Sequence, residues 1–196
     1  MKKKGIMPYL ILIIILFSSF QPQELISGID REVANEMFTY LQALRQKKTD
    51  RSDKLNRYVK KKRPLLTWND TLAKVAEARA IDLAEKNYFD HVDPLGYGVN
   101  YYIDRSGYYL EPDWTEKRSD NFFESLQAGR SEAYDIIEDL VIDKGIPSKG
   151  HRKHLLGLDD WNEKNTDIGI GFYRVGDGIR SEYATYTVII IARHRW

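Results

Sequence analysis

The chain has no cysteine among its 196 residues. Disulfides, a catalytic thiol and a thiolate metal site are therefore excluded, and stability must come from packing. The chain also lacks a phosphate-binding glycine loop, a dinucleotide fingerprint and a His-Glu-x-x-His motif. Neither Ser125 nor Ser148 lies in a Gly-x-Ser-x-Gly elbow, and we interpret Ser148 as a helix N-cap rather than a nucleophile.

Neither positive nor negative charge is in marked excess. The chain has 30 basic and 29 acidic residues, and three of the basic ones are Lys2, Lys3 and Lys4. Without these three lysines, 27 basic and 29 acidic residues leave a net charge of −2. Nothing in this balance indicates a nucleic-acid partner. We interpret the basic stretch 54–63 as a solvated linker or helix end rather than a binding patch.

The three terminal lysines precede an apolar run from Ile6 to Phe20, which is the pattern of an export signal. The run is shorter than the ~20 residues that span a bilayer. We predict a cleaved signal peptide over 1–22, with a retained N-terminal anchor as the alternative. The protein is then exported, periplasmic or extracellular, and contacts a membrane only through this segment if it stays uncleaved. Residues 29–196 are expected to form a single domain.

Hydrophobic periodicity predicts helices and strands in a mixed order. Apolar residues at helical spacing indicate helices over 29–47, with Asp30 as N-cap, and from Asn69 to about 87. Further helices are expected over 99–106 and 131–143, and a short one carries His151. Strands are expected over 121–126, 167–174 and 183–193, the last two as an antiparallel hairpin. A doubly apolar final strand indicates a sheet covered on both faces, hence an α+β fold.

Histidine is scarce, with four in the chain, and two of the four have distinctive surroundings. His91 and His151 both lie in short segments rich in glycine, proline and acidic or aromatic neighbours. Imidazole and carboxylate groups together can bind a borderline cation or transfer protons. His154 and His194 lack such surroundings, and we interpret them as structural or surface residues.

Two acids are candidate partners of these histidines. Glu124 interrupts an apolar stretch, so its carboxylate is expected to be partly buried and to need a partner. Asp143 is placed at a helix C-terminus, where the helix dipole disfavours an anion and favours a nearby histidine or cation. The alternative for each is a solvated carboxylate with no role in a site.

Three motifs resemble those of a known family. Residues 66–76, the Phe-x-His-x-x-Pro-x-Gly pattern around His91 and the Gly-His-Arg pattern around His151 fall in the order and spacing of the CAP superfamily. This superfamily comprises cysteine-rich secretory proteins, antigen 5 and pathogenesis-related proteins, with bacterial SCP-like members. The resemblance extends from about residue 29 to 192.

The resemblance implies a three-layer α-β-α sandwich with a central, mainly antiparallel sheet. It also implies a central cavity in which His91, His151, Glu124 and a second acid meet. Asp143 stands close to where the family has its second acid, and Glu138 is the rival for that position. The glycine and asparagine that flank the family glutamate are absent around Glu124.

Three hypotheses for function follow from these residues. The first is an exported binding module whose cavity holds a divalent cation, zinc in particular. The family resemblance implies that an adjacent groove takes a lipid, sterol-like or cell-wall ligand. The second is a metal-assisted hydrolase that uses the same His91, His151, Glu124 and Asp143 cluster, with one of the two acids as general base. The third is a polar cluster that only stabilises the fold.

Overall fold

The computed structural model describes residues 27–195. The predicted signal peptide over 1–22 lies outside these residues. Among the helices that are described, none is both long enough and apolar enough to cross a lipid bilayer.

The centre of the fold is the predicted hairpin. Strands β4 (Asp167–Arg174) and β5 (Thr185–Ala192) pair antiparallel along their whole length, with Asp167 opposite Ala192. Strand β3 (Glu124–Ala128) pairs antiparallel with the other edge of β5. Two short strands pair with β4: β1 (Gly28–Ile29) antiparallel and β2 (Thr67–Trp68) parallel. The sheet is therefore mainly antiparallel, as predicted.

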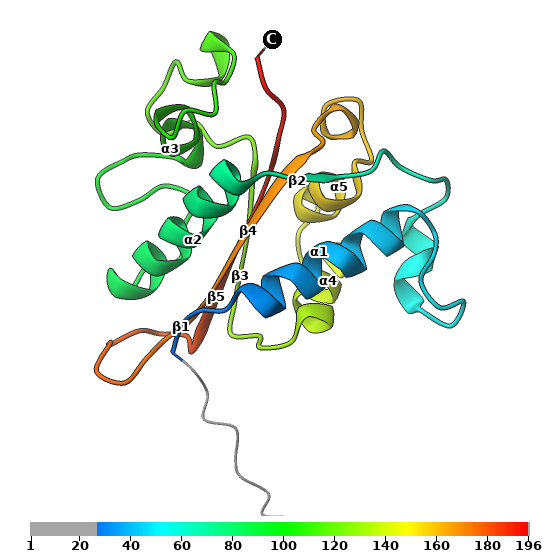
Figure 1. The fold of residues 1–196 in the computed structure, drawn as a ribbon, viewed down its shortest axis with the longest axis horizontal. Coiled ribbons are helices and arrows are strands. Elements are labelled where there is room, and N and C mark those ends of the chain that lie inside the picture. Colours follow the sequence, from blue (N-terminus) through cyan, green and yellow to red (C-terminus); the bar gives the residue numbers. More distant parts are fainter. Residues whose placement is uncertain (1–26, 196) are drawn as a thin grey trace, which may run out of the picture.

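Helices cover both faces of this sheet (Figure 1). One face carries α2 (Asp70–Glu85) and α3 (Val99–Arg105). The opposite face carries α1 (Arg31–Arg45), α4 (Ala133–Ile142) and α5 (Gly150–Leu156). Three 3-10 turns complete the elements of the described residues: η1 (Lys54–Tyr58), η2 (Pro112–Trp114) and η3 (Asn162–Lys164).

Side chains of the two central strands alternate between two hydrophobic cores. Ile189 and Ile191 of β5 pack with α1, α4 and α5, whereas Val188 and Ile190 pack with α2 and α3. Every residue of β5 is buried, as its continuous apolar run predicts. The fold is thus the expected three-layer α-β-α sandwich.

The first two helices begin where the sequence predicts. The Asp30 carboxylate accepts hydrogen bonds from the backbone amides of Glu32 and Val33. The Asn69 side chain accepts from Thr71 and Leu72 in the same way. Both side chains satisfy amides that have no partner inside the helix.

Two local expectations are wrong. Ser148 does not cap α5, because Lys149 is the N-cap, in a left-handed conformation with φ 53° and ψ 43°, and the Lys149 side chain makes no capping hydrogen bond. The short strand expected over 121–126 forms over Glu124–Ala128 instead. Its start is displaced because Phe122 donates its backbone amide to the Asn100 side chain rather than to a neighbouring strand.

Glycines on β4 let α2 pack closely on the sheet. Ile168, Ile170 and Phe172 point into the core beneath α1, so the residues between them face α2. A Cβ atom added at Gly169 would collide with the backbone of Leu72 and Ala73, and one at Gly171 with the backbone of Ala76. The helix backbone cannot move aside without disturbing the core around it.

We predict that Gly171→Ala lowers the free energy of unfolding by about 3 kcal/mol, because the new methyl group overpacks a backbone contact. Ile170→Val on the opposite face of the same strand is the control and should lower it by about 1 kcal/mol. Urea unfolding of the two variants measures both values. Equal stability of Gly171→Ala and wild type would contradict the close packing of α2 on β4.

Candidate histidine and carboxylate site

His91 lies on the connection between α2 and α3, which a buried aspartate organises. The Asp93 carboxylate accepts hydrogen bonds from the backbone amides of Leu95 and Tyr97 at 2.8 and 2.9 Å and from the Tyr102 hydroxyl. Burial would raise the pKa of Asp93, but the hydrogen bonds from Tyr102 and the two amides lower it below its ordinary value. The turn that presents His91 is therefore built around a fixed anion.

Glu124, the first residue of β3, has a side chain with no exposed surface and three donors around it. His91 Nδ1 lies 2.9 Å from its Oε2, Asn121 Nδ2 lies 3.2 Å from the same oxygen, and Arg79 Nε lies 3.2 Å from Oε1. This confirms the expectation that the Glu124 carboxylate is buried and partnered.

Arg79 supplies the charge that balances Glu124, a role that the sequence interpretation did not assign. Its side chain is 3% exposed, and it also donates to the Tyr88 hydroxyl and, at 2.8 Å, to the Asp90 carbonyl. Burial lowers the pKa of Arg79, but the neighbouring Glu124 carboxylate outweighs it and the net shift is upward. An arginine within the apolar stripe of the second helix is the signal in the sequence that a buried cation needs an acidic partner.

Asp143 and His151 form a second pair of the same kind. Asp143 is the left-handed C-cap of α4, with φ 52° and ψ 48°, and its side chain is 1% exposed. His151 Nδ1 lies 2.9 Å from its Oδ1, and the backbone amide of Arg152 donates to Oδ2 at 3.3 Å. Donors from α5 thus offset the cost of an anion at a helix C-terminus. Glu138 lies elsewhere and pairs with Lys54 Nζ at 2.6 Å.

The two pairs bring the histidine rings together. The centroids of the His91 and His151 rings are 6.5 Å apart, with 35° between the ring planes. A carboxylate can only accept a hydrogen bond, so the proton of each neutral ring must be on Nδ1 and Nε2 must be a free acceptor. Within residues 27–195, no protein donor contacts either Nε2 atom.

A cavity of about 490 Å³ surrounds these rings. Its polar lining includes His91, Glu124, His151 and Asn121. Three half-exposed apolar side chains also line it, Phe122 at 44%, Ile146 at 41% and Trp161 at 36% exposure. Asn121 Oδ1 is buried and has no hydrogen-bond partner among the described residues. The cavity therefore combines acceptors that require a partner with an apolar rim.

His154 lines the same cavity but is fixed in a different way. Its Nδ1 lies 2.7 Å from the Ser125 hydroxyl, and its Nε2 lies 3.4 Å from the Ile191 carbonyl. Burial lowers the pKa of His154 to about 4. Within residues 27–195 no carboxylate orients this ring, so it differs from the serine, histidine and acid arrangement of hydrolases. His154 is structural, as interpreted from the sequence.

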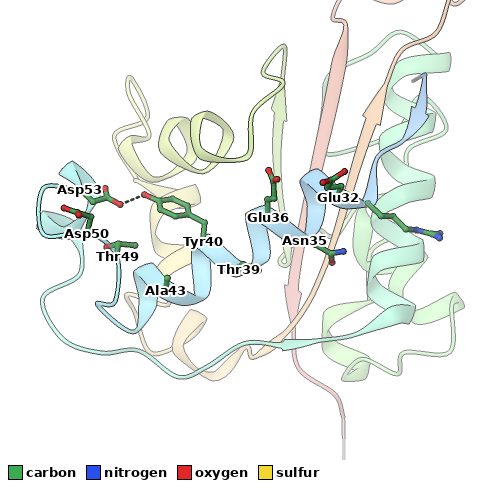
Figure 2. Close-up of a pocket in the computed structure, with 10 residues that line it drawn as sticks. Glu32, Asn35, Glu36, Thr39, Tyr40, Ala43, Thr49, Asp50 and Asp53 are labelled. Carbon is green, nitrogen blue, oxygen red and sulfur yellow. Dashed lines mark hydrogen bonds between the residues drawn. The ribbon is translucent and has the colours of Figure 1, made fainter. Parts of the chain in front are cut away.

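His194 lies outside the cavity. It stacks on Tyr108, with ring centroids 3.8 Å apart, and its Nε2 lies 3.3 Å from Asp167 Oδ2. A larger hollow of about 860 Å³ follows the outer side of α1 (Figure 2). Its lining includes Glu36, Asp50 and Asp53 but no histidine. The two predicted site histidines thus belong to the smaller cavity.

The described residues contain no group of three or more histidine, cysteine, aspartate or glutamate side chains arranged to hold a metal ion. Both histidine rings line the cavity, and the Glu124 and Asp143 carboxylates behind them are engaged by the Nδ1 atoms of the rings. Protein zinc sites use three or four protein ligands. The donor set therefore fits a cation only if water or a ligand supplies the remaining positions.

Comparison with known proteins identifies the family. The model of the Cysteine-rich secretory protein family (CAP) matches residues 43–190. The chain belongs to this family. No curated protein matched the chain significantly.

Two solved structures share the fold. An outer surface protein from Borrelia burgdorferi aligns with a TM-score of 0.55 and 21% identity, over 87% of this chain and 100% of that one. An extracellular protein containing an SCP domain from Bacillus anthracis str. Ames aligns with a TM-score of 0.52 and 23% identity, over 84% of this chain and 41% of that one. At these identities the likeness extends to the fold alone.

We predict that Arg79→Met lowers the free energy of unfolding by about 3 kcal/mol or more, because it leaves the buried Glu124 carboxylate without its countercharge. Arg31→Met is the control, since Arg31 is 72% exposed where it pairs with Glu77. That change should cost less than about 1 kcal/mol. Similar losses for the two variants in urea unfolding would show that the Arg79 and Glu124 pair is not important for stability.

The lowered pKa of His154 leads us to expect that stability depends on pH. Its pKa in the folded protein is about 4, below the ordinary value of 6.5, so the unfolded chain binds the proton first as the pH falls. Stability should be unaffected above pH ~6.5 and should decrease between pH ~6.5 and ~4, by about 3 kcal/mol in total. Urea unfolding of wild type and His154→Gln across this range isolates the effect. The expectation fails if both proteins lose the same stability.

Proposed function

We propose that this CAP-family chain is an exported binding protein, and that His91 and His151 bind a divalent cation, zinc in particular, in the cavity. The observation that carries the proposal is the pairing of each ring with a buried carboxylate through Nδ1. A carboxylate behind the ring fixes the tautomer and the orientation of a metal-binding histidine and increases its basicity. The same arrangement at both rings leaves two Nε2 acceptors facing one cavity.

In this proposal His91 and His151 are the direct ligands, and Glu124 and Asp143 orient them. A bound cation would act as a Lewis acid with open positions for oxygen donors. The two imidazoles alone hold a cation less firmly than three or four protein ligands would, so a ligand that adds an oxygen donor should strengthen binding. Cation and ligand binding are then coupled.

The cavity rim supports an amphiphilic ligand. Phe122, Ile146 and Trp161 offer apolar surface, while the histidines and Asn121 offer polar contacts at the base. Small-molecule sites commonly combine a mostly apolar lining with a few converging polar groups. We propose a lipid or cell-wall component as the ligand, with its apolar part against the rim and its oxygen donors near the histidines.

Export is proposed from two separate observations. The chain begins with a charged and then apolar segment of the export-signal type. The two solved structures compared above are described as an outer surface protein and an extracellular protein.

The metal-assisted hydrolase is the alternative for the same cluster. A general base needs an acceptor that reaches the reacting proton. The Glu124 carboxylate is already surrounded by Arg79, His91 and Asn121, and Asp143 by His151 and an amide. Because both carboxylates already have hydrogen-bond partners, the arrangement favours binding over hydrolysis.

The metal content of the purified protein tests the proposal. In equilibrium dialysis against zinc, wild type should bind about one zinc ion per chain. His91→Ala combined with His151→Ala should bind almost none, and His194→Ala, which changes a histidine outside the cavity, should match wild type. Equal metal content in wild type and the double variant would rule out the site.

Assays of ester, peptide and cell-wall substrates, with and without a chelator, separate binding from hydrolysis. The binding protein should give no chelator-sensitive turnover. Turnover that is lost both with chelator and in the His91 and His151 double variant would instead establish the hydrolase.

A further inference from the structure

Positive charge is concentrated in one segment of the described chain. Residues 47–63 contain nine basic and two acidic side chains, a net charge of +7. The other described residues contain 18 basic and 26 acidic side chains, a net charge of −8. The near-neutral total therefore hides a strongly asymmetric charge distribution, which attracts an anionic partner to one side of the molecule.

The segment is a folded loop at the end of α1, on the side of the molecule away from α2 (Figure 1). Leu55 and Val59 have no exposed surface and pack in the core beneath α1 and α4. Asn56 bridges the loop, because its side chain accepts from the Thr49 hydroxyl at 2.7 Å and donates to the Asp50 carbonyl at 2.7 Å. The interpretation of 54–63 as a solvated linker or helix end did not include these anchors, although the short helix η1 lies within it.

The two acidic residues of the segment form hydrogen bonds within the protein. Asp53 caps η1 through the Leu55 amide at 2.8 Å and accepts from the Tyr40 hydroxyl at 2.6 Å, which Figure 2 shows meeting it. Asp50 accepts from both the amide and the hydroxyl of Ser52. Both carboxylates are therefore engaged locally and not by the lysines and arginines beside them.

Few acids elsewhere neutralise the segment. Lys54 pairs with Glu138 at 2.6 Å, and Lys61 and Arg63 share Glu163 at 3.8 and 3.7 Å. Among residues 27–195 no carboxylate forms an ion pair with the other six, which are Lys47, Lys48, Arg51, Arg57, Lys60 and Lys62. The two arms of the loop adjoin, because Lys47 Nζ donates to the Lys60 carbonyl at 3.3 Å. Lys47, Lys48, Lys60 and Lys62 thus form one exposed patch.

We infer that residues 47–63 form a docking surface for a linear polyanion, separate from the histidine cavity. Lysine predominates, and its mobile point charge suits repeated anionic groups without one fixed geometry. Proteins that bind a bilayer surface combine basic residues with apolar side chains that insert into the bilayer. In this segment Leu55 and Val59 are buried, and Tyr58 lies beneath the Arg152 guanidinium, 4.0 Å from its ring centre. Residues 47–63 therefore offer positive charge but no exposed large apolar side chain that could insert into a bilayer.

Binding of the full-length protein to labelled inorganic polyphosphate tests this inference. The variant combines Lys48→Gln, Arg51→Gln, Lys60→Gln and Lys62→Gln, whose side chains make no hydrogen bond or ion pair with described residues. The matched control combines Lys117→Gln, Lys144→Gln, Lys164→Gln and Arg180→Gln, which are also three exposed lysines and one exposed arginine. Fluorescence anisotropy at several salt concentrations gives the affinity and its salt dependence.

The variant should bind polyphosphate roughly tenfold or more weakly than wild type, and the slope of log affinity against log salt should fall by about 3. The control should resemble wild type. Equal weakening of variant and control would show that net charge, not this surface, determines binding. Unchanged binding by the variant would overturn the inference.

Vesicles of phosphatidylglycerol and phosphatidylcholine provide the competing partner. If the four substitutions at 48–62 reduce vesicle binding while polyphosphate binding stays at the wild-type level, the surface serves a membrane and the inference is wrong. Zinc content should be the same in wild type, variant and control, so failure of the polyanion surface and failure of the histidine site can be distinguished.

Discussion

The buried ion pair between Arg79 and Glu124 is the interaction on which the candidate site depends. It joins α2 to the start of β3 in a place with almost no solvent. Two charges in such a place are tolerated only if each is fully hydrogen-bonded. Arg79 meets this requirement with Tyr88 and Asp90, and Glu124 with Asn121 and His91. The orientation of the His91 ring is therefore a consequence of completing the hydrogen bonds of a buried carboxylate.

The second half of the site follows the same principle in a different part of the fold. Asp143 ends α4 in a left-handed conformation, and α5 returns with His151 Nδ1 and the Arg152 amide directed at its carboxylate. One pair comes from the α2 side of the sandwich and the other from the α4 and α5 side. The two rings meet at the start of β3, which is the strand at one edge of the sheet. The cavity is thus a product of the three-layer arrangement.

Much of this architecture could be predicted from the sequence, because the signals are local. The side chains of Asp30 and Asn69 cap helices, and the alternation of isoleucine with glycine in 167–174 indicates a strand. The Ser148 cap was wrong because a lysine in a left-handed conformation makes the turn, which residue type does not reveal. The basic segment was interpreted as a linker because Leu55 and Val59 are too few to indicate a core by periodicity.

The four residues of the candidate site could be nominated from the sequence, but the hydrogen bonds and ion pairs that hold them could not. Four residues distant in the sequence could be nominated from motif resemblance and from the cost of burying acids, yet Arg79 as the partner of Glu124 depends on how α2 lies against β3. That contact is tertiary, and no pattern of residue spacing in the sequence indicates it. The engagement of Asp143 rather than Glu138 likewise depends on the left-handed end of α4.

The central claim is that two carboxylate-bound rings direct their Nε2 atoms into one cavity. Nitrogen NMR of the ring-labelled histidines, recorded at neutral pH before and after addition of zinc, tests it most directly. The account predicts that His91 and His151 are protonated at Nδ1 and that zinc shifts the Nε2 signals of both rings. Protonation at Nε2, or Nε2 signals that zinc leaves unchanged, would contradict it.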